Sequence, residues 1–548
     1  MEKPKHRAVM FSAETRIRLV PMQVSIVLSL VFLALGFLYS FHFWWPLIVF
    51  LPLALLGLYD FSQPKHSLLR NYPILGRMRF FLEALGPPIH QYFIESNQDG
   101  APFNRDWRAL MYQRAKGIEA KKPFGTEMDV YKTNYEWLNH SLTPRPIAEE
   151  EPRVTIGGPQ CSKPYSASVF NISAMSFGSL GPNAVMALNT GAKKGNFYHC
   201  TGEGGISKYH RKPGGDLNWQ IGSGYFGCRK DDGSFDPDLF AEQSQDDQVK
   251  MVEIKLSQGA KPGHGGILPG AKVTAEIAEA RKVPIGTTCE SPAFHKEFST
   301  PIGLLEFVAK LRELSGGKPI GFKMCVGHPW EFMAICKAML KTEITPDFIV
   351  VDGAEGGTGA APLELTDHMG TPLREGLVFV QNALVGAGVR DKIRVGVSGK
   401  MVSPGLIAAG MAIGADYANS ARGFMFALGC LQTQRCHSNE CPVGIATQDR
   451  KMQKALVVED KAQRVFQYHE GTINVLKEIV AAAGLRHPSE LKPEYIMMRT
   501  GPTEVKSLAA VYDFLKPGEL VAGSDHPIFT QYWEMATAES FHSKDYEA

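Results

Sequence analysis

Net charge of either sign is almost missing from this sequence. It has 58 lysines and arginines against 56 aspartates and glutamates, a formal net charge of +2 over 548 residues. Such a balance provides no global field to attract nucleic acid, and we expect no nucleic-acid partner. With 44% hydrophobic and 21% charged residues the composition is globular, which excludes a disordered or collagen-like chain. A mean hydropathy close to zero excludes a polytopic membrane protein.

The sequence also lacks the even number of cysteines that full pairing in disulfides would need. The nine cysteines are an odd number for a paired disulfide framework. In a chain of this length we interpret them as reduced thiols or metal ligands, and we expect a reducing compartment.

Charged residues are missing altogether from residues 19–59. A bilayer core of about 30 Å takes roughly 20 helical residues, so this stretch fits two crossings better than one. The sequence predicts a first crossing near residues 22–41 and a shorter second one near 46–59. The break falls at residues 42–46, where aromatic rings suit the headgroup layer and proline suits a helix start.

Basic residues flank this stretch on both sides. Lys3, Lys5, Arg7, Arg16 and Arg18 precede it, and Lys65, Arg70, Arg77 and Arg79 follow it. By the positive-inside rule we expect both flanks in the cytoplasm, and therefore a membrane-anchored protein with two transmembrane helices and a cytoplasmic main domain. The alternatives are a cleaved signal peptide, for which the apolar run is too long, and a buried hairpin that serves as a homo-oligomer contact.

We assign the membrane anchor to residues 1–60. After it the composition and the residue pattern of the chain change twice. Residues 61–150 are polar and aromatic, as in a helical connector, and 105–115 within them can form one amphipathic helix. From 151 to 480 short β-branched runs alternate with helix-length segments. Residues 481–548 form a C-terminal extension to which we assign no chemistry.

The alternation after residue 150 predicts eight βα units. The expected strands are 169–173, 197–200, 251–255, 283–288, 320–325, 348–352, 393–397 and 417–420, with helices at 271–281, 302–314, 330–340 and 401–413. Eight such units indicate an α/β fold of the (β/α)8 TIM-barrel type, with chemistry at the carboxyl ends of the strands. A doubly wound open sheet is the alternative, but no Gly-x-Gly-x-x-Gly opens a helix after the first strand.

Glycines and cations gather at the predicted strand ends. These ends are 173–179, 200–205, 255–264, 352–360, 397–400 and 419–423. Glycines let a flat ligand approach the backbone, and the cations attract an anion. The last two ends lie where barrels most often bind phosphate, so we expect a phosphate-bearing cofactor. Lys323, within the fifth strand, either pairs inside the barrel or meets the ligand.

Three cysteines lie close together after the last predicted strand. They are Cys430, Cys436 and Cys441, and Pro442 follows the third. This arrangement is typical of iron–sulfur ligation, and the lack of a fourth nearby cysteine favours a three-iron over a four-iron cluster. The alternatives are a zinc site completed by His437 and three buried thiols. The other six cysteines are expected to be inert core thiols.

The motifs at the strand ends and around the cysteines resemble those of the synthase domain of glutamate synthases, both in their residues and in their order along the chain. They include Ser173-Ala-Met-Ser-Phe-Gly178, Thr201-Gly-Glu-Gly-Gly205, Gln258-Gly-Ala-Lys-Pro-Gly263, Gly356-Gly-Thr-Gly-Ala360 and Cys441-Pro-Val-Gly-Ile-Ala-Thr-Gln448. The resemblance covers roughly residues 150–480 and implies an FMN-binding (β/α)8 barrel next to a [3Fe-4S] cluster. In that family electrons reach the flavin through the cluster, 2-oxoglutarate condenses with ammonia, and 2-iminoglutarate is reduced to L-glutamate.

The resemblance also implies roles for single residues. Glu203 resembles the acidic residue near the reaction centre, and Lys261 and Arg281 resemble the groups that hold the carboxylates of 2-oxoglutarate. The FMN-binding residues would be Ala174, Met175, Ser176, Thr201, Gln258, Lys323, Gly353, Ser398, Gly399, Lys400, Ala421 and Arg422. The cluster ligands would be Cys430, Cys436 and Cys441. The electron donor would be a ferredoxin or a reductase subunit.

The sequence departs from the family in places that bear on substrate and cofactor. His264 and Ile267 stand where the family has an acidic residue and a glutamine, and Ile267 cannot make the polar contact of a glutamine. Ser398-Gly399-Lys400 replaces an acidic-glycine-glycine sequence near the phosphate. The amidotransferase domain with its cysteine nucleophile, the long carboxy-terminal β-helix and a Rossmann fingerprint are all missing. We expect a stand-alone, membrane-tethered relative that takes ammonia from solution or from another subunit.

Three functions are consistent with these residues. The first is an FMN- and iron–sulfur-dependent oxidoreductase that reduces an imine formed from 2-oxoglutarate, or a related 2-oxo acid, and ammonia or an amine. The second is a membrane-tethered electron-transfer protein that exchanges electrons with a quinone or another redox partner. The third is a catalytically silent scaffold, against which the retained Glu203, Lys261, Arg281 and cysteines argue. We predict the first.

Overall fold

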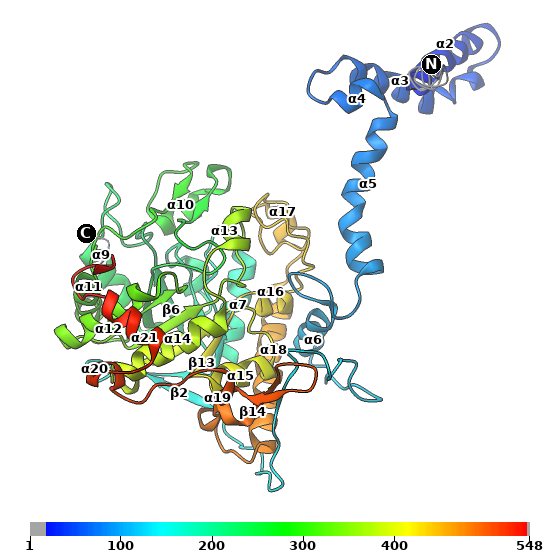
Figure 1. Ribbon diagram of the computed structural model, residues 1–548. Helices are drawn as coiled ribbons and strands as arrows, with labels where there is room; N and C mark the ends of the chain where they lie inside the picture. Colours follow the sequence, from blue (N-terminus) through cyan, green and yellow to red (C-terminus); the bar gives the residue numbers. More distant parts are fainter. Residues whose placement is uncertain (1–17, 545–548) are drawn as a thin grey trace, which may run out of the picture. The chain divides into compact units, whose positions relative to one another are not determined.

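The computed structural model describes residues 18–544. The chain divides into two compact units with the boundary between Asp106 and Trp107, and each unit is described by itself (Figure 1). The predicted flanking residues Lys3, Lys5, Arg7 and Arg16 lie outside the described residues.

The first unit contains the two apolar helices expected from the charge-free stretch. They are α2 (Val20–Leu38) and α3 (Leu47–Ser62), joined by the 3-10 turn η1 (Phe41–Trp44). The two helices pack antiparallel, since Met22 lies against Gly57 and the rings of Phe32 and Phe50 stack with centroids 5.9 Å apart. By length and composition two stretches could cross a membrane, Val20–Leu38 and Phe41–Ser62, and the second consists of η1 and α3 together. The unit continues through α4 (Ser67–Asn71), α5 (Leu75–Ile89) and the π-helical turn η2 (His90–Ile94).

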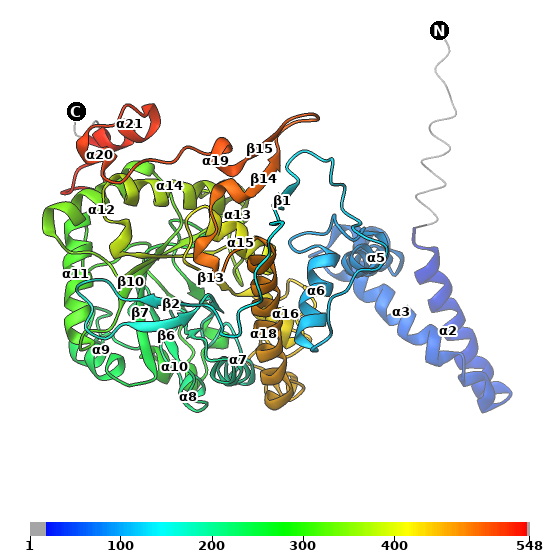
Figure 2. The same cartoon turned by 90° about the horizontal axis from the view of Figure 1, so that it is seen from below.

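The second unit is built around a closed barrel of eight parallel strands (Figures 1 and 2). In barrel order they are β4 (Phe170–Ile172), β5 (His199–Cys200), β6 (Leu217–Ile221), β7 (Val249–Lys255), β10 (Ile320–Met324), β11 (Phe348–Asp352), β12 (Arg394–Ser398) and β13 (Tyr417–Ser420). The barrel closes where β13 pairs with β4, with Ala418 opposite Phe170 and Ser420 opposite Ile172. The predicted (β/α)8 TIM barrel is confirmed.

Helices follow the strands. They are α7 (Pro182–Lys194), α8 (Lys208–Arg211), α9 (Pro237–Ser244), α10 (Ala275–Arg281), α11 (Pro301–Leu314), α12 (Pro329–Thr342), α13 (Leu363–His368), α14 (Leu373–Gly386), α15 (Pro404–Ala412), α16 (Arg422–Leu428), α17 (Arg450–Gln453) and α18 (Val458–Ala482). The helices α7, α9, α11, α12 and α15 begin with proline, whose fixed φ suits the first helical turn. The predicted helices correspond to α10, α11, α12 and α15, although α10 starts at Ala275 rather than at residue 271.

The remaining elements lie outside the barrel. They are α6 (Arg105–Ala115), which confirms the predicted helix at 105–115, the sheet of β1 (Glu136–Leu138), β14 (Ile496–Arg499) and β15 (Val505–Ser507), the strand pair β8 (Ile267–Leu268) and β9 (Cys289–Glu290), and the short helices α19 (Leu508–Val511), α20 (Glu519–Ala522) and α21 (Pro527–Met535). The sheet joins the segment before the barrel to the segment after it, because β1 pairs with β14.

A β-hairpin covers the amino-terminal end of the barrel. The antiparallel strands β2 (Arg153–Ile156) and β3 (Tyr165–Ser168) form it. Ile156 and Tyr165 pack with the interior residues Phe348 and Tyr417 in one buried apolar cluster. Gly396 has no side chain because a Cβ there would lie 2.4 Å from the Tyr417 ring. This apolar layer fills one end of the barrel.

One of the eight predicted strands is wrong. Residues 283–288 form turns after α10, where Ile285 is 67% exposed. The barrel strand missing from the prediction is β6, so β7 is the fourth strand of the barrel and not the third. The apolar pattern missed β6 because Asn218 and Gln220 interrupt it. Both side chains face the barrel interior and donate hydrogen bonds to the Glu253 carboxylate.

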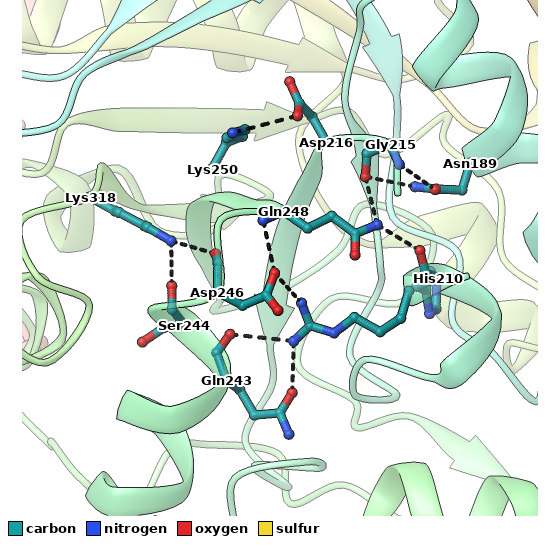
Figure 3. Close-up of polar contacts among 11 residues, drawn as sticks. Asn189, His210, Gly215, Asp216, Gln243, Ser244, Asp246, Gln248, Lys250 and Lys318 are labelled. Atoms are coloured by element: carbon teal, nitrogen blue, oxygen red, sulfur yellow. Dashed lines mark hydrogen bonds and ion pairs between the residues drawn. The ribbon is translucent and has the colours of Figure 1, made fainter. Parts of the chain in front are cut away.

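Polar side chains fix the start of β6 (Figure 3). The Asn189 amide exchanges two hydrogen bonds with the Gly215 backbone, at 2.9 and 3.1 Å. The Gln248 amide donates to the carbonyl oxygens of His210 at 2.7 Å and Gly215 at 2.8 Å. The Leu217 N–H donates to the Gln248 carbonyl at 2.8 Å. Specific hydrogen bonds therefore hold this strand where the sequence carries no continuous apolar run.

We expect Gln248→Ala to lower the apparent melting temperature of the detergent-purified protein. The substitution removes two hydrogen bonds, each of which contributes about 1 kcal/mol. The His210 carbonyl loses its side-chain donor, and the Gly215 carbonyl keeps only the Asn189 amide. Gln245→Ala is the matched control, since its exposed amide makes a single bond to the Leu314 carbonyl. An equal fall in both variants would contradict a structural role for Gln248.

Candidate active site

An ion pair lies at the carboxyl-terminal end of the barrel. Glu203 belongs to the loop after β5, and Lys255 is the last residue of β7. The Lys255 Nζ lies 2.7 Å from the Glu203 Oε1, and the two side chains are 10% and 16% exposed. Gly222 and Gly266 lie against the carboxylate, and a side chain at either position would collide with it. The carboxylate is therefore enclosed by backbone and held by an ammonium.

Two further cations act on the same carboxylate. Burial by itself would raise the pKa of Glu203, but the charges of Lys255, Arg281 and Lys261 together hold that pKa below its usual range. Glu203 is therefore ionised at neutral pH. Burial lowers the pKa of Lys261, and it also lowers the pKa of Arg281. Three cations face one carboxylate here, which leaves an excess of two positive charges.

Lys261 and Arg281 reach this place from different elements. Lys261, in the loop after β7, is 6% exposed and donates to the Gly265 carbonyl at 3.1 Å. Arg281, at the end of α10, donates to the Phe177 carbonyl at 3.3 Å and lies over the Phe226 ring, 5.0 Å from its centroid. Among the described residues no partner accepts from its buried Nε. The structure thus brings the predicted residues Glu203, Lys261 and Arg281 together.

A second group of charges lies inside the barrel. Lys323 on β10 is 3.4 Å from Asp352 on β11, and both side chains are almost fully buried. Asp352 also accepts the Gly259 N–H at 2.9 Å. Burial by itself would lower the pKa of Lys323, but Asp352 and Glu253 raise it above its usual value. Of the two roles that the sequence left open for Lys323, the structure shows pairing with a carboxylate. Gln258, predicted beside the same cofactor, is half-buried in the loop after β7.

Close backbone contacts join the loops that follow β4 and β5. Gly202 has a φ of +67°, and a Cβ there would lie 2.6 Å from the Ser176 nitrogen and 2.9 Å from the Met175 carbonyl carbon. The buried Thr201 hydroxyl donates to the Gly202 carbonyl at 3.0 Å and accepts the Gln220 N–H at 3.1 Å. The predicted cofactor residues Ala174, Met175 and Ser176 are half-buried on the first of these loops.

Small residues end the strands β11 and β12, and also β4, which follows β13 around the barrel. The Gly353 N–H donates to the Ser398 carbonyl at 2.8 Å, and the hydroxyls of Ser398 and Ser173 lie 3.2 Å apart. Gly399 and Lys400 both have positive φ, +144° and +51°, so the turn after β12 is sharp. Backbone and small side chains at these strand ends would let a flat group approach closely. These residues fit a flavin with a phosphate.

Arg422 connects the loop after β11 to the loop of the cysteines. It follows the half-buried Ala421 at the end of β13 and starts α16. Its guanidinium donates to the Thr358 carbonyl at 2.5 Å and lies 3.8 Å from the Cys436 Sγ. The contact of Arg422 with a cofactor phosphate stays a prediction. The structure shows Arg422 in contact with Cys436 of the cysteine loop.

The three cysteines of the predicted cluster lie near one another after α16. Burial raises the pKa of the Cys430 thiol, and the nearby Cys436 and Cys441 raise it as well. Within residues 18–544 no three His, Cys, Asp or Glu side chains stand close enough to hold a metal ion. His437, the alternative zinc ligand, is exposed. Three thiols in one loop fit an iron–sulfur cluster by donor chemistry, and ligation would require the loop to draw them together.

Two side chains that were not predicted hold the cysteine loop in place. Lys272 is 4% exposed and donates to the Cys436 carbonyl at 2.9 Å. Tyr112 on α6 donates to the Cys430 carbonyl and meets the Phe426 ring edge-on at 5.8 Å. No local pattern marks Lys272 or Tyr112, because their partners are distant in sequence. Lys255 stands at the start of the predicted cation-rich strand end 255–264, although no role of its own was predicted for it.

The departures from the family pattern lie beside this site. Ile267, on β8, is 50% exposed and directly follows Gly266, which contacts the Glu203 carboxylate. His264 is exposed in the same loop. The position that carries a glutamine in the family is therefore apolar and open to solvent here.

We expect Lys255→Met to raise the pKa of Glu203, because burial then outweighs the remaining cations. Infrared difference spectra against Glu203→Gln should show the protonated carboxyl band at a higher pH than in the unaltered protein. Lys250→Met is the control, since Lys250 lies 3.8 Å from Asp216 at the amino-terminal end of the barrel. A Lys255→Met protein in which Glu203 titrates as before would contradict the assignment.

The lowered pKa of Glu203 also predicts a pH dependence of stability. A carboxyl with a folded-state pKa below its ordinary value of about 4.3 stabilises the fold above that value, and the contribution is lost as pH falls through the folded-state pKa. The melting temperature of the unaltered protein should therefore exceed that of Glu203→Gln most clearly near neutral pH. A gap that widens on acidification would be inconsistent with an ionised Glu203.

One known family matches more than half of this chain. The family described as "Conserved region in glutamate synthase" matches residues 128–486. The glutamate synthase large subunit-like protein YerD of Bacillus subtilis is 38% identical over 495 residues, 83% of this chain and 93% of YerD. The archaeal-type glutamate synthase (NADPH) of Thermotoga neapolitana is 34% identical over 320 residues, 58% of this chain. The archaeal glutamate synthase (NADPH) of Methanocaldococcus jannaschii is 34% identical over 322 residues, 59% of this chain. The chain spans 60% of the length of each of these two relatives. It belongs to the glutamate synthase family.

Proposed function

We propose that this chain is a glutamate synthase-like oxidoreductase. It reduces an imine, formed from 2-oxoglutarate or a related 2-oxo acid and ammonia or an amine, to an amino acid. The observation that carries the proposal is the group of Glu203, Lys255, Lys261 and Arg281 at the carboxyl end of the barrel. Its excess of two positive charges matches the two carboxylates of 2-oxoglutarate.

Lys261 and Arg281 bind the substrate carboxylates. Within residues 18–544 the buried Arg281 Nε–H has no acceptor, and a bound carboxylate would satisfy it. The Phe177 carbonyl and the Phe226 ring already fix the guanidinium, so the donor is oriented before the ligand arrives. Two cations on separate elements select a dicarboxylate over a monocarboxylate.

Glu203 binds the nitrogen atom of the substrate through hydrogen bonds. Lys255 keeps its carboxylate ionised, so it can accept hydrogen bonds from ammonia, an ammonium ion or the imine N–H. Reduction of the C=N bond adds two electrons and two protons, which form one C–H and one N–H bond. The N–H bond requires a proton at the imine nitrogen. Glu203 and its partner Lys255 would lie beside that nitrogen.

FMN, when bound, supplies the hydride for the imine carbon. The small residues that would hold it are Ser173, Ala174, Gly353, Ser398, Gly399 and Ala421. Lys323 is kept protonated by Asp352 and would offer a fixed positive charge of the kind that stabilises a reduced flavin.

Cys430, Cys436 and Cys441 would ligate a [3Fe-4S] cluster. Arg422 supports this arrangement, because it contacts Cys436 and the Thr358 carbonyl of the glycine loop after β11. Electrons would come from a ferredoxin or a reductase subunit. The helices α2 and α3 would anchor the protein in a membrane with the barrel in the cytoplasm. These two helices also favour a second candidate, electron exchange between the flavin and a membrane quinone.

The proposal is tested by reoxidation of the reduced flavin. The protein is purified anaerobically, reduced, and mixed with 2-oxoglutarate and ammonium, with 2-oxoglutarate and methylamine, or with a quinone alone. We expect reoxidation by a 2-oxo acid with ammonium or methylamine, with one amino acid formed per flavin. Lys261→Ala should raise the KM for the 2-oxo acid by about 10- to 100-fold, the value of a charged hydrogen bond. Reoxidation by quinone alone would favour the second candidate, and a protein without FMN or iron would contradict both.

We expect serine at Cys430, Cys436 or Cys441 to abolish iron binding while FMN stays bound. Thiolate ligands are required for the cluster, and the flavin residues belong to other loops. Iron content, flavin absorbance and the electron paramagnetic resonance spectrum of the cluster measure the two cofactors separately. Cys161→Ser, at a half-buried cysteine outside this loop, is the control. Full iron content in Cys436→Ser would exclude this cysteine as a ligand.

We expect Ile267→Gln to lower the KM for 2-oxoglutarate. The substitution restores an amide next to Gly266, and an amide can donate a hydrogen bond that isoleucine cannot. Steady-state kinetics with 2-oxoglutarate and with a monocarboxylic 2-oxo acid measure the effect, and Ile285→Gln is the exposed control. An unchanged KM in Ile267→Gln would show that this position does not contact the 2-oxo acid.

A further inference from the structure

The helix α5 has one apolar face that the described chain leaves uncovered. At 100° per residue six apolar side chains fall within one third of the helix circumference. They are Leu75, Met78, Phe81, Leu82, Leu85 and Ile89, and all except Leu85 are between 42% and 58% exposed. Phe80 lies outside this arc, where its ring meets the His66 ring edge-on with centroids 5.8 Å apart. Arg79 and Glu83, also outside the arc, form an ion pair at 2.7 Å, one turn apart. The helix is therefore amphipathic, with its apolar side toward the surroundings.

An ion pair fixes the start of α5 to the end of α3. Asp60 is fully buried, and its carboxylate accepts from the Arg77 Nη2 at 2.6 Å and the Arg77 Nε at 2.9 Å. It also accepts the Ile74 N–H at 3.1 Å. A bidentate bond to a buried carboxylate with a backbone donor is a specific, directional connection. Asp60 lies in the last turn of the second candidate membrane span, so α5 starts where that span ends.

The turn after α5 continues the exposed apolar surface. Tyr92, Phe93 and Ile94 in η2 are 57%, 85% and 65% exposed. Tyrosine is enriched in the headgroup layer of a membrane, where its ring has one apolar and one wet side.

We propose that α5 lies in the membrane–water interface with Leu75, Met78, Phe81, Leu82 and Ile89 in the lipid. The proposal rests on the anchor proposed above and extends it from two crossing helices to a third helix parallel to the surface. Continuity with the second span favours lipid as the occupant, since the Asp60–Arg77 pair keeps the start of α5 at the end of that span. Arg70, on the preceding helix α4, suits anionic headgroups.

The test measures the depth of single side chains in the full-length protein. A genetically encoded spin label replaces Met78, Glu83 or Leu30, and each protein is placed in vesicles of phosphatidylcholine with phosphatidylglycerol. Power saturation compares collisions with oxygen, which concentrates in lipid, and with a water-soluble nickel chelate. We expect an oxygen-to-nickel ratio that is several-fold higher at position 78 than at position 83. Position 30, which is exposed on α2, reports the span itself.

The outcomes separate this proposal from the anchor. A lipid signal at positions 30 and 78 supports both, and a water signal at position 30 overturns the anchor together with this inference. A lipid signal at position 30 with nickel access at position 78 overturns only the interfacial helix. Protection of position 78 from both reagents would mean that protein covers the apolar face, either a second copy of the chain or another part of this one. That outcome also overturns the proposal.

A matched pair of variants tests whether the apolar face holds the helix. With the label at position 89, Phe81→Asn together with Leu82→Asn should raise nickel access several-fold. Arg79→Gln together with Glu83→Gln alters the opposite side and should leave that access unchanged. Unchanged access in the Asn variant would show that these side chains do not hold α5 at the membrane, and the proposal would fail.

Discussion

Two lysines stand opposite each other on neighbouring strands of the barrel, and the site depends on how their charges are balanced. Lys255 on β7 and Lys323 on β10 are register partners. Like charges in this position repel, so each needs its own carboxylate. Glu203 pairs with Lys255, and Asp352 pairs with Lys323. One carboxylate comes from the loop after β5 and the other from β11, on either side of the two lysine strands.

This separation gives the two lysines different environments. The Lys323 pair is almost fully buried in the barrel interior, next to Glu253 and the side chains of β6. The Lys255 pair is at the barrel end, where Lys261 and Arg281 also act on the Glu203 carboxylate, so that three cations share one carboxylate. A buried excess of positive charge is stable when an anion completes it. The anion-binding character of the site therefore follows from the same arrangement that stabilises the barrel.

The glycine loops, the cysteine loop and seven of the eight barrel strands could be predicted, because each is a local pattern of apolar, small or ligand-forming residues. The strand β6 could not, since Asn218 and Gln220 face a polar interior and hydrogen bonds at Gly215 fix its start. The segment 283–288 failed for the opposite reason. It is apolar enough for a strand, but Pro284 and Gly286 make it a turn.

The sequence by itself determined the class of the barrel, the two apolar helices and which residues could carry chemistry. Spacing and composition are local properties. A helix or strand with one buried face needs apolar residues at a fixed period, and each segment shows that period in its own sequence. Only the tertiary structure decided which charges meet. Lys255 with Glu203, Lys272 with the Cys436 carbonyl, and Arg422 between Thr358 and Cys436 join residues from different loops. Their distances depend on strand register and on barrel closure, and no local pattern encodes either.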